Sequence, residues 1–352
     1  MRGTTERCRM DSLRSERVKI SDEIEEINRF FYEKGWSDGL PIIPPTEERV
    51  LRLLQGTGRM ANEGIGLIPP KWAEATIEKI AINALMAGCI PEHMPVIIAA
   101  LEAMTVEAFN LYGIQTTTHP CCPLVIINGP IRKPLGINCD YGLLGPGTLA
   151  NAVIGRAIRL ILLNIGGAVP GAVDKATHGQ PGKYTYVLGE NEEESPWEPL
   201  HLERGFRPDE STVTVMAAEG PHNINDHWST SAAGILTTLA GTLAGQGNNN
   251  ILYQMGGPLI LLGPEHAKTI AKEGFTKKEV KEFIFEKAKI PKSAFSMDIQ
   301  EQRFASFPDE ALIPVTCMPE NMVLVVAGGA GRHSMVIPTF GNTLPVTKLI
   351  EE

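Results

Sequence analysis

Apolar residues follow two different spacings along this chain. Long apolar stretches with helical spacing occupy residues 72–87 and 92–109, and Pro91 with Glu92 precedes the second, as is typical of helix starts. Further along, short runs of branched apolar residues end at Gly, Pro or Asn, as residues 124–127 do before Asn128-Gly-Pro130, and such runs predict strands. The pattern predicts a mixed α/β fold with a helix-rich N-terminal part.

The expected elements can be placed by their caps and turns, with Ser21 and Thr276 in N-cap positions. The expected helices cover residues 22–34, 46–54, 72–87, 92–109, 148–164, 231–244, 265–273 and 277–289. The expected strands cover residues 124–127, 183–188, 212–216, 259–262, 323–327, 335–337 and 346–349.

Two strands share an internal likeness. Pro123-Leu-Val-Ile-Ile-Asn-Gly-Pro130 resembles Pro258-Leu-Ile-Leu-Leu-Gly-Pro264, and Met322-Val-Leu-Val-Val-Ala-Gly-Gly329 is a third strand-to-glycine turn. The length of 352 residues also favours about two domains. We therefore expect a flexible leader over 1–20 and two related α/β halves with short strands and Gly/Pro turns, over 21–170 and 171–352, facing a shared cleft.

Composition excludes several classes of protein. The net charge is −9 and the pI about 5.5, so the chain carries no nucleic-acid footprint. The hydrophobic content of 43% and the mean hydropathy of −0.04 are ordinary for a globular protein. No stretch reaches 18 consecutive apolar residues, so no membrane span is expected. Six cysteines without framework spacing and without C-x-x-C favour a reduced, cytoplasmic setting. The abundant apolar helix surface favours a homo-oligomer.

Candidate chemistry is densest in Thr116-Thr-Thr-His-Pro-Cys-Cys-Pro123. Each proline favours an extended residue before it, which places His119 and Cys121 on one side of the chain and Cys122 on the other. A thiol beside an imidazole can yield a thiolate near neutral pH. Cys121 is then the expected nucleophile, His119 its base and Cys122 a second thiol; alternatively, both cysteines are small buried hydrophobes.

A second cluster is His222-Asn-Ile-Asn-Asp-His227. In a loop, His222, Asp226 and His227 could converge on a divalent metal, with His119 or Cys121 completing the ligand set. No cofactor is certain, however, since the spacing matches no standard zinc signature. A loop of hydrogen-bonded polar residues that caps the following helix is the alternative.

Two further segments offer polar groups. After an apolar strand, Gly328-Gly-Ala-Gly-Arg-His-Ser334 predicts an anion-binding turn built from Gly329, Gly331, Arg332, His333 and Ser334. A tight hairpin is the alternative. The acidic run that starts at Glu190 precedes Trp197, His201 and Glu203, so that Glu190 or Glu203 could act as a general base, although charge runs are usually solvated faces.

Several long motifs are similar to those of a known family. These are Gly35-Trp-Ser-Asp-Gly-Leu-Pro-Ile-Ile-Pro-Pro-Thr-Glu-Glu-Arg-Val50, Gly113-Ile-Gln-Thr-Thr-Thr-His-Pro120, Gly179-Gln-Pro-Gly-Lys-Tyr-Thr185, Glu192-Glu-Glu-Ser-Pro-Trp-Glu-Pro-Leu-His201, His222-Asn-Ile-Asn-Asp-His227 and Gly331-Arg-His-Ser334. Over residues 35–350 the chain resembles the poorly characterised UGSC-motif (seleno)protein family. It lacks Cys-Gly-Ser-Cys, so it resembles the companion module. The resemblance implies thiol or selenol chemistry nearby, on a small redox partner chain, and assigns no role to Cys121 or Cys122.

Three functional hypotheses follow. The leading one is an oxidoreductase or lyase, or its substrate-binding subunit, that acts on a small anionic molecule through Cys121 and His119. The second is a metal-dependent hydrolase or lyase that uses His222, Asp226 and His227. The third is a non-catalytic scaffold for a small redox subunit. A Rossmann-type dehydrogenase is disfavoured, because neither Gly142-Leu-Leu-Gly-Pro-Gly147 nor the loop at 328–331 has the required G-x-G-x-x-G order.

Overall fold

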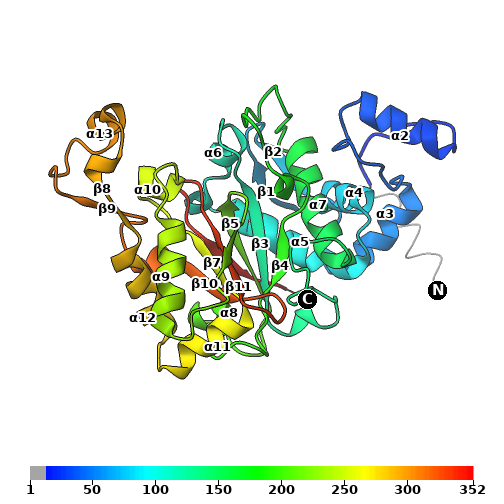
Figure 1. The fold of residues 1–352 in the computed structure, drawn as a ribbon. Helices are drawn as coiled ribbons and strands as arrows, with labels where there is room; N and C mark the ends of the chain where they lie inside the picture. Colours follow the sequence, from blue (N-terminus) through cyan, green and yellow to red (C-terminus); the bar gives the residue numbers. More distant parts are fainter. Residues whose placement is uncertain (1–12, 352) are drawn as a thin grey trace.

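Two four-stranded sheets lie face to face at the centre of the computed structural model, which describes residues 13–351 (Figure 1). The first sheet has the order β12-β5-β3-β4, with bounds Val346–Leu349, Thr212–Ala218, Cys122–Asn128 and Val187–Gly189. The second has the order β10-β7-β11-β6, with bounds Val323–Val326, Leu259–Leu262, His333–Ile337 and His222–Asn225. Two small two-stranded antiparallel sheets pair β1 (Gly64–Ile68) with β2 (Ala73–Thr76) and β8 (Lys289–Pro291) with β9 (Leu312–Pro314).

Alternation along the strands divides the core into three apolar layers. Val125 and Ile127 of β3 pack among helices, whereas Leu124 and Ile126 pack against the second sheet. The first sheet is covered by α4 (Ile77–Ala87), α5 (Met94–Met104) and α7 (Leu149–Asn164), and the second by α9 (Ala232–Leu243), α11 (Pro264–Lys272) and α12 (Lys277–Lys287). The order of layers is therefore helix, sheet, sheet, helix, which confirms the predicted α/β class.

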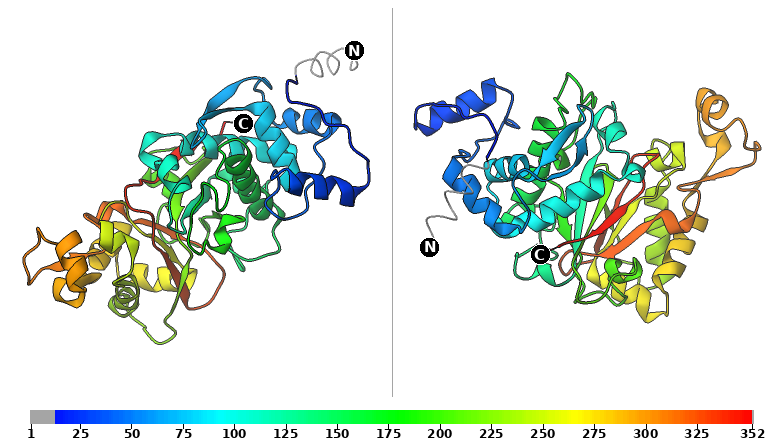
Figure 2. Two further views of the ribbon diagram at one scale, coloured as in Figure 1. Left: turned by 90° about the horizontal axis from the view of Figure 1, so that it is seen from above. Right: turned by 180° about the vertical axis from the view of Figure 1, so that it is seen from behind.

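Shorter elements complete the fold around these layers. The remaining α-helices are α2 (Ile24–Glu33), α3 (Glu47–Leu53), α6 (Leu111–Gln115), α8 (Leu200–Glu203), α10 (Asn249–Tyr253) and α13 (Met297–Arg303). The 3-10 turns are η1 (Leu54–Gly56), η2 (Pro91–His93), η3 (Glu107–Phe109), η4 (Pro130–Arg132), η5 (Pro181–Lys183), η6 (Lys292–Ala294) and η7 (Pro319–Asn321). Figure 2 shows α2 and α13 at opposite ends of the molecule, with the sheets between them.

The two sheets have the same topology. The two proline-bounded runs of the sequence are β3 and β7, and each is an inner strand with one parallel and one antiparallel neighbour. In the first sheet β4 is the parallel neighbour and β5 the antiparallel one, and in the second these places belong to β10 and β11. The likeness of the two halves thus extends from the strand sequences to their pairing.

Each half contributes an edge strand to the other half's sheet. The chain leaves β5 of the first sheet and forms β6 in the second, and it leaves β11 of the second sheet and forms β12 in the first. The two crossing segments pair at an isolated bridge between Ala218 and Thr339. Glu219 N–H donates to the Pro338 carbonyl over 2.9 Å, and Phe340 N–H donates to the Ala217 carbonyl over 2.8 Å. These bonds join matching positions of the halves, so an approximate twofold axis passes between them.

This exchange corrects the predicted domain organisation. The expected boundary at residue 170 falls between β3 and β4, which share a sheet, and β12 returns to the first sheet from the far end of the chain. Of the leader over 1–20, residues 1–12 lie outside the described residues. The backbone N–H groups of Arg14 and Ser15 donate to the carboxylate of Glu78.

Several predicted boundaries also need correction. The helix expected over 72–87 begins only at Ile77, because Trp72 has a positive φ of 54° and residues 73–76 pair with β1 as a strand. The helix expected over 92–109 is divided into η2, α5 and η3. Strands β1, β6, β8 and β9 were not expected. Within the described part of the chain, no single helix is both long and apolar enough to cross a membrane.

The inter-sheet layer makes a stability prediction at matched positions. Leu124→Ala and Leu259→Ala each remove a fully buried side chain from corresponding sites of β3 and β7. Each variant should lose about 2–5 kcal/mol of unfolding free energy, measured by urea denaturation. Leu67→Ala, at a side chain that is 53% exposed, is the control and should lose far less. A small loss at only one of the two sites would contradict the equivalent packing.

Candidate functional site

His119 lies directly before β3, close to the crossing point of the two halves. Its Nε2 is 2.7 Å from Oε1 of Glu219, and its Nδ1 accepts a 3.2 Å hydrogen bond from the backbone N–H of Cys121. The ring also packs on Phe340, with centroids 5.2 Å apart. Because Nδ1 accepts, Nε2 carries the proton and donates to the Glu219 carboxylate. Both ring nitrogens are therefore engaged, and neither contacts a thiol.

The two cysteines lie on opposite faces of the first sheet, as predicted. Cys121 is 1% exposed and packs in the layer beneath the helices, whereas Cys122 is 7% exposed and belongs to the inter-sheet layer. Burial raises the pKa of the Cys121 thiol far above its ordinary value. Burial likewise raises the pKa of Cys122 to about 12, although the charges of Lys183 and Arg159 oppose the rise.

These positions correct the predicted catalytic pair. Cys121 has no imidazole at its sulfur, it is sealed from solvent, and its thiol stays protonated near neutral pH. His119 contacts Cys121 only through the backbone N–H, as a structural bond. The alternative reading of both cysteines as small buried hydrophobes fits their surroundings better.

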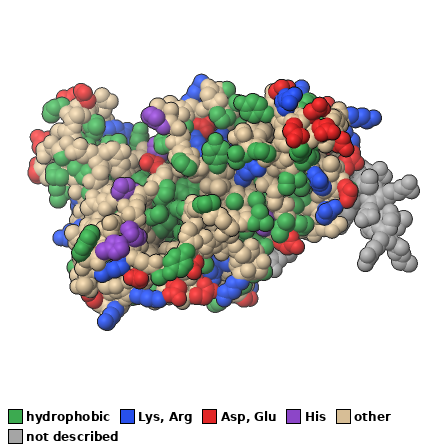
Figure 3. All heavy atoms as spheres, turned by 45° about the vertical axis from the view of Figure 1, so that its right-hand side comes forward, with side chains coloured by type: hydrophobic (Ala, Val, Ile, Leu, Met, Phe, Trp, Pro, Cys, Tyr) green, Lys and Arg blue, Asp and Glu red, His purple; other side chains and the backbone are tan. Residues whose placement is uncertain are grey.

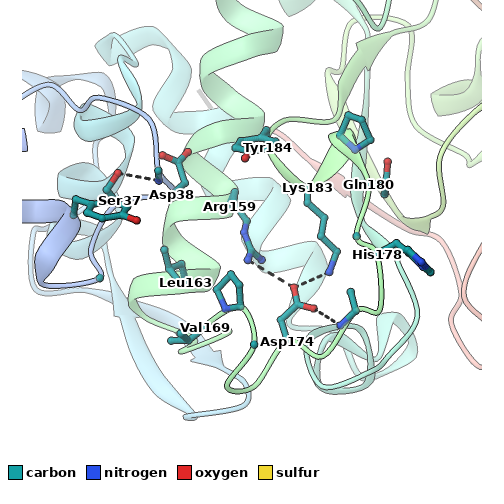
Figure 4. Close-up of a pocket in the computed structure, with 18 of the residues that line it drawn as sticks. Ser37, Asp38, Arg159, Leu163, Val169, Asp174, His178, Gln180, Lys183 and Tyr184 are labelled. Carbon is teal, nitrogen blue, oxygen red and sulfur yellow. Dashed lines mark hydrogen bonds and ion pairs between the residues drawn. The ribbon is translucent and has the colours of Figure 1, made fainter.

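A large cavity lies beside the His-Pro-Cys-Cys-Pro segment, between the end of α2 with the residues that follow it and the loop after α7. It has a volume of about 1140 Å³ and is lined by Tyr32 and Glu33 of α2, by residues 35–39 except 36, by Arg159 and Leu163 of α7, and by residues of the 169–184 segment (Figure 4). We call it the α7 cavity. Two of the long motifs, Gly35-Trp-Ser-Asp-Gly39 and Gly179-Gln-Pro-Gly-Lys183, approach it from opposite sides.

A buried carboxylate between two cations forms the polar centre of the α7 cavity. Lys183 Nζ lies 2.6 Å and Arg159 Nη2 3.7 Å from Oδ2 of Asp174, and Figure 4 shows both side chains directed at this carboxylate. Asp174 Oδ1 accepts a bond from the backbone N–H of Ala176. The two cationic side chains are each 14% exposed, so solvent screens them weakly.

The cavity is connected to the His-Pro-Cys-Cys-Pro segment through its wall. Gln180 lines the cavity, and its Nε2 lies 3.0 Å from Sγ of Cys122. The backbone N–H of Thr177 donates to the Thr118 carbonyl over 2.9 Å. Cys122 is thus the thiol that lies behind this cavity, one side chain away from it.

The predicted metal ligands are not gathered into a metal site. His222 and His227 are exposed at and just beyond β6, and Asp226 is buried and uses its oxygens for the N–H groups of Trp228 and Ser229 and the hydroxyl of Thr238. His227 instead approaches His333, with 3.1 Å between their Nε2 atoms. Among residues 13–351, no group of three or more His, Cys, Asp or Glu side chains could hold a metal ion. The alternative of a polar loop that caps the following helix is right only in part: Asp226 accepts structural hydrogen bonds, but Ser231 is the N-cap of α9 and residues 222–225 form β6.

The predicted anion-binding turn is also occupied by structural contacts. Arg332 donates to the carbonyls of His227 and Ser229, and Ser334 accepts from the N–H of Gly263 and bonds Nδ1 of His266. A side chain at Gly329 would collide with the ring of Tyr141. Gly331, directly before Arg332, has a positive φ of 136°, and His333 is the first residue of β11. The turn is not a hairpin either, because β7 lies between β10 and β11.

The two candidate general bases lie far from His119, near the other end of β4. Burial acts to raise the pKa of Glu203, but Lys281 and Lys277 outweigh it, so the pKa is lowered and Glu203 is a poor base. Glu190 is fully buried, and burial raises its pKa although Lys277 opposes this. Glu203 and Lys277 line a second cavity of about 790 Å³, here called the α12 cavity.

The charged side chains on one face of the molecule do not form a patch of a single sign that would indicate a charged partner. On the face shown in Figure 3, acidic and basic side chains are interspersed, and apolar side chains gather around a hollow near the middle.

No known family model, curated protein or solved structure matches this chain. The residues and their geometry therefore carry the functional argument.

Arg159, Asp174 and Lys183 were missed as candidates from the sequence. Arg159 comes from α7 and the other two from the 169–184 segment, and neither Arg159 nor Asp174 belongs to a recognisable motif. The available signal was the pair of long glycine motifs at 35–39 and 179–183, which line the same cavity.

The thiols make a direct chemical prediction. Iodoacetamide at pH 7.5 should label Cys317, which is exposed, and leave Cys121 and Cys122 unmodified in the folded protein, as read by peptide mass spectrometry. Labelling in urea is the control. Because the folded pKa values lie above the unfolded ones, the stability that these thiols contribute is full below about pH 8.5 and falls as the pH rises further. Rapid labelling of Cys121 in the native state would restore its nucleophile role.

Asp226 provides a test of a structural hydrogen-bonding role against a metal-ligand role. Burial opposes ionisation of Asp226, but hydrogen bonds from Ser229, Thr238 and Trp228 lower its pKa to about 2. Asp226→Ala should cost about 1–3 kcal/mol of unfolding free energy at pH 7. That difference should vanish as the pH falls from about 4 towards 2. A carboxylate whose pKa is lower in the folded state stabilises the fold above its unfolded pKa, and this stability is lost as the pH falls through the folded pKa. EDTA should leave the wild-type melting temperature unchanged, whereas a metal ligand would make it fall.

Proposed function

We propose that this protein is an enzyme, or the substrate-binding subunit of one, that takes a small anionic molecule into the α7 cavity. The observation that carries the proposal is the Arg159–Asp174–Lys183 centre, in which two weakly exposed cations share one carboxylate. The centre keeps a net positive charge, inside a cavity large enough for a small molecule.

The guanidinium of Arg159 has donors to spare for such a ligand. Its Nη2 faces Asp174 and the Ala168 carbonyl, and within the described residues neither Nε nor Nη1 has a hydrogen-bond partner. A guanidinium presents its N–H groups as a planar fork that suits carboxylate or phosphate oxygens. Asp174 holds both cations in place, so the ligand does not have to order them.

The geometry shifts the weight of the proposal from thiols to this anion site. Neither Cys121 nor Cys122 supplies a thiolate at neutral pH, so a redox or lyase reaction that begins with thiolate attack is not supported for these two residues. The scaffold hypothesis gains from the same observation. If the thiol or selenol chemistry implied by the resemblance takes place here, a small partner chain would bring it, and this chain would hold the anionic substrate.

Anion binding is tested with malonate and inorganic phosphate as probes and malonamide as the neutral analogue of malonate. Isothermal titration should show that at least one anion binds and that malonamide does not. Arg159→Gln should weaken that binding about 10- to 100-fold, because hydrogen bonds to charged groups are worth about 1.5–3 kcal/mol. Lys183→Gln should weaken it as well.

Lys175→Gln is the matched control. It removes a positive charge from the same loop at an exposed side chain that does not line the α7 cavity. If Lys175→Gln weakens binding as much as Arg159→Gln, the anion responds to the overall charge and the proposal fails. Circular dichroism of each variant separates lost binding from lost folding.

A further inference from the structure

A row of polar side chains closes the inter-sheet layer at the end of β3 opposite His119. Thr212 of β5 is the register partner of Asn128, and Glu190, directly after β4, donates its backbone N–H to the Ile127 carbonyl over 3.3 Å. The row thus spans three adjacent strands at one level. Leu124, Ile126, Leu188 and Met216 face the second sheet, so alternation places Asn128, Glu190 and Thr212 on that same face.

His201 completes what we call the inter-sheet polar cluster: Asn128, Glu190, His201 and Thr212. It comes from α8, next to Leu200, whose side chain packs in the inter-sheet layer and whose backbone N–H donates to Oε2 of Glu190 over 2.7 Å. The side chains of the cluster are at most 2% exposed. The cluster lies about 20 Å from Cys122, the length of β3, and is separate from the α7 cavity.

Five atoms of this cluster are buried without any hydrogen-bond partner. They are Oδ1 of Asn128, Oε1 of Glu190, Oγ1 of Thr212 and both ring nitrogens of His201. The remaining donors and acceptors are used: Asn128 Nδ2 donates to Oε2 of Glu190 over 2.6 Å and to Oε1 of Glu192 over 3.1 Å. Sealed polar atoms without partners destabilise a fold, and here all five belong to the four residues of one cluster.

The second half of the molecule shows that the fold itself does not need such a cluster. By strand register, Leu259–Leu262 corresponds to residues 124–127, so Gly263 occupies the place of Asn128. In the same way Val326 corresponds to Gly189, and Ala327 takes the place of Glu190. The same strand topology therefore closes with Gly and Ala in one half and with a buried carboxylate and amide in the other.

The ion pairs around the cluster leave one carboxylate oxygen of Glu190 without a hydrogen bond. The carboxylates Glu190, Glu192, Glu193 and Glu203 are linked to three mostly buried cations, Arg132, Lys277 and Lys281. Lys133 reaches Glu193 only from solvent, at 74% exposure. Lys277 Nζ is 3.7 Å from Oε1 of Glu190, too far for a hydrogen bond, so this oxygen keeps its capacity to bind a ligand.

We propose that the inter-sheet polar cluster binds one monovalent cation of the potassium or ammonium type. Oδ1 of Asn128, Oε1 of Glu190, Oγ1 of Thr212 and one nitrogen of His201 offer four acceptors, which matches the four N–H donors of ammonium. Three of the four are oxygens, the ligands that hard cations prefer. Only Glu190 offers a free carboxylate oxygen, so a divalent ion would have a single charged ligand. The ion would enter from the α12 cavity past Lys277, which lines it.

Thermal unfolding of the full chain tests the site. The melting temperature is measured in KCl, NH₄Cl, NaCl and choline chloride at one ionic strength. Potassium or ammonium should raise it by about 2–5 °C relative to choline, because a ligand bound only by the native state stabilises it by mass action. Equal melting temperatures in all four salts would mean that the cluster holds only water, and the proposal would be overturned. A shift with only one of the two ions identifies which one binds.

Matched threonines of one strand locate the ion. Thr212→Val removes one of the unpartnered oxygens, whereas Thr214→Val, two residues along the same face, removes a hydroxyl that is paired with Thr347. Thr212→Val should lose most of the ion-specific shift and Thr214→Val should keep it. Glu190→Gln should also abolish the shift. An equal shift in both threonine variants would place the ion elsewhere and reject the proposal.

Discussion

Two backbone hydrogen bonds at the crossing of the halves, Glu219 to Pro338 and Phe340 to Ala217, constrain the rest of the structure. At this crossing the chain passes from each sheet into the other, so neither sheet is complete without residues from the opposite half. Because the sheets are interlaced in this way, their inner faces must pack on each other, and the inter-sheet layer becomes the common core. A cut at residue 170 would separate β3 from β4, which share a sheet. The domain boundary predicted from chain length and strand likeness is therefore wrong.

The inter-sheet layer also separates the chemistry of the molecule into two regions. At one end of β3, His119 and Cys122 lie beside the α7 cavity, where Arg159 and Lys183 share Asp174. At the other end, Asn128 begins the inter-sheet polar cluster beneath the α12 cavity. Since β3 is an inner strand of its sheet, it holds both regions on a rigid element.

Sequence reasoning succeeded where local pattern decides the structure. Strands 259–262 and 346–349, and the opposite faces of Cys121 and Cys122, follow from alternation and turn residues alone. It failed where pairing is nonlocal. Residues 222–225 read as a polar loop, yet they form a strand because β11 offers them an edge. The same limit applies to the site. No local sequence pattern predicts that Arg159 and Lys183 both pair with Asp174, or that Arg332 donates its hydrogen bonds to two backbone carbonyls.

Burial decides which of the reactive residue types can do chemistry here. The thiols that dominate the sequence are enclosed by apolar neighbours, so desolvation holds them protonated, and nearby Lys183 and Arg159 only partly offset this at Cys122. The cations themselves remain at a cavity, where a carboxylate positions them without filling the donors of Arg159. A region whose charge is organised and whose donors are free is better suited to bind a ligand than one whose reactive atoms are sealed. For this reason we propose anion recognition, rather than thiol chemistry, as the role of this chain.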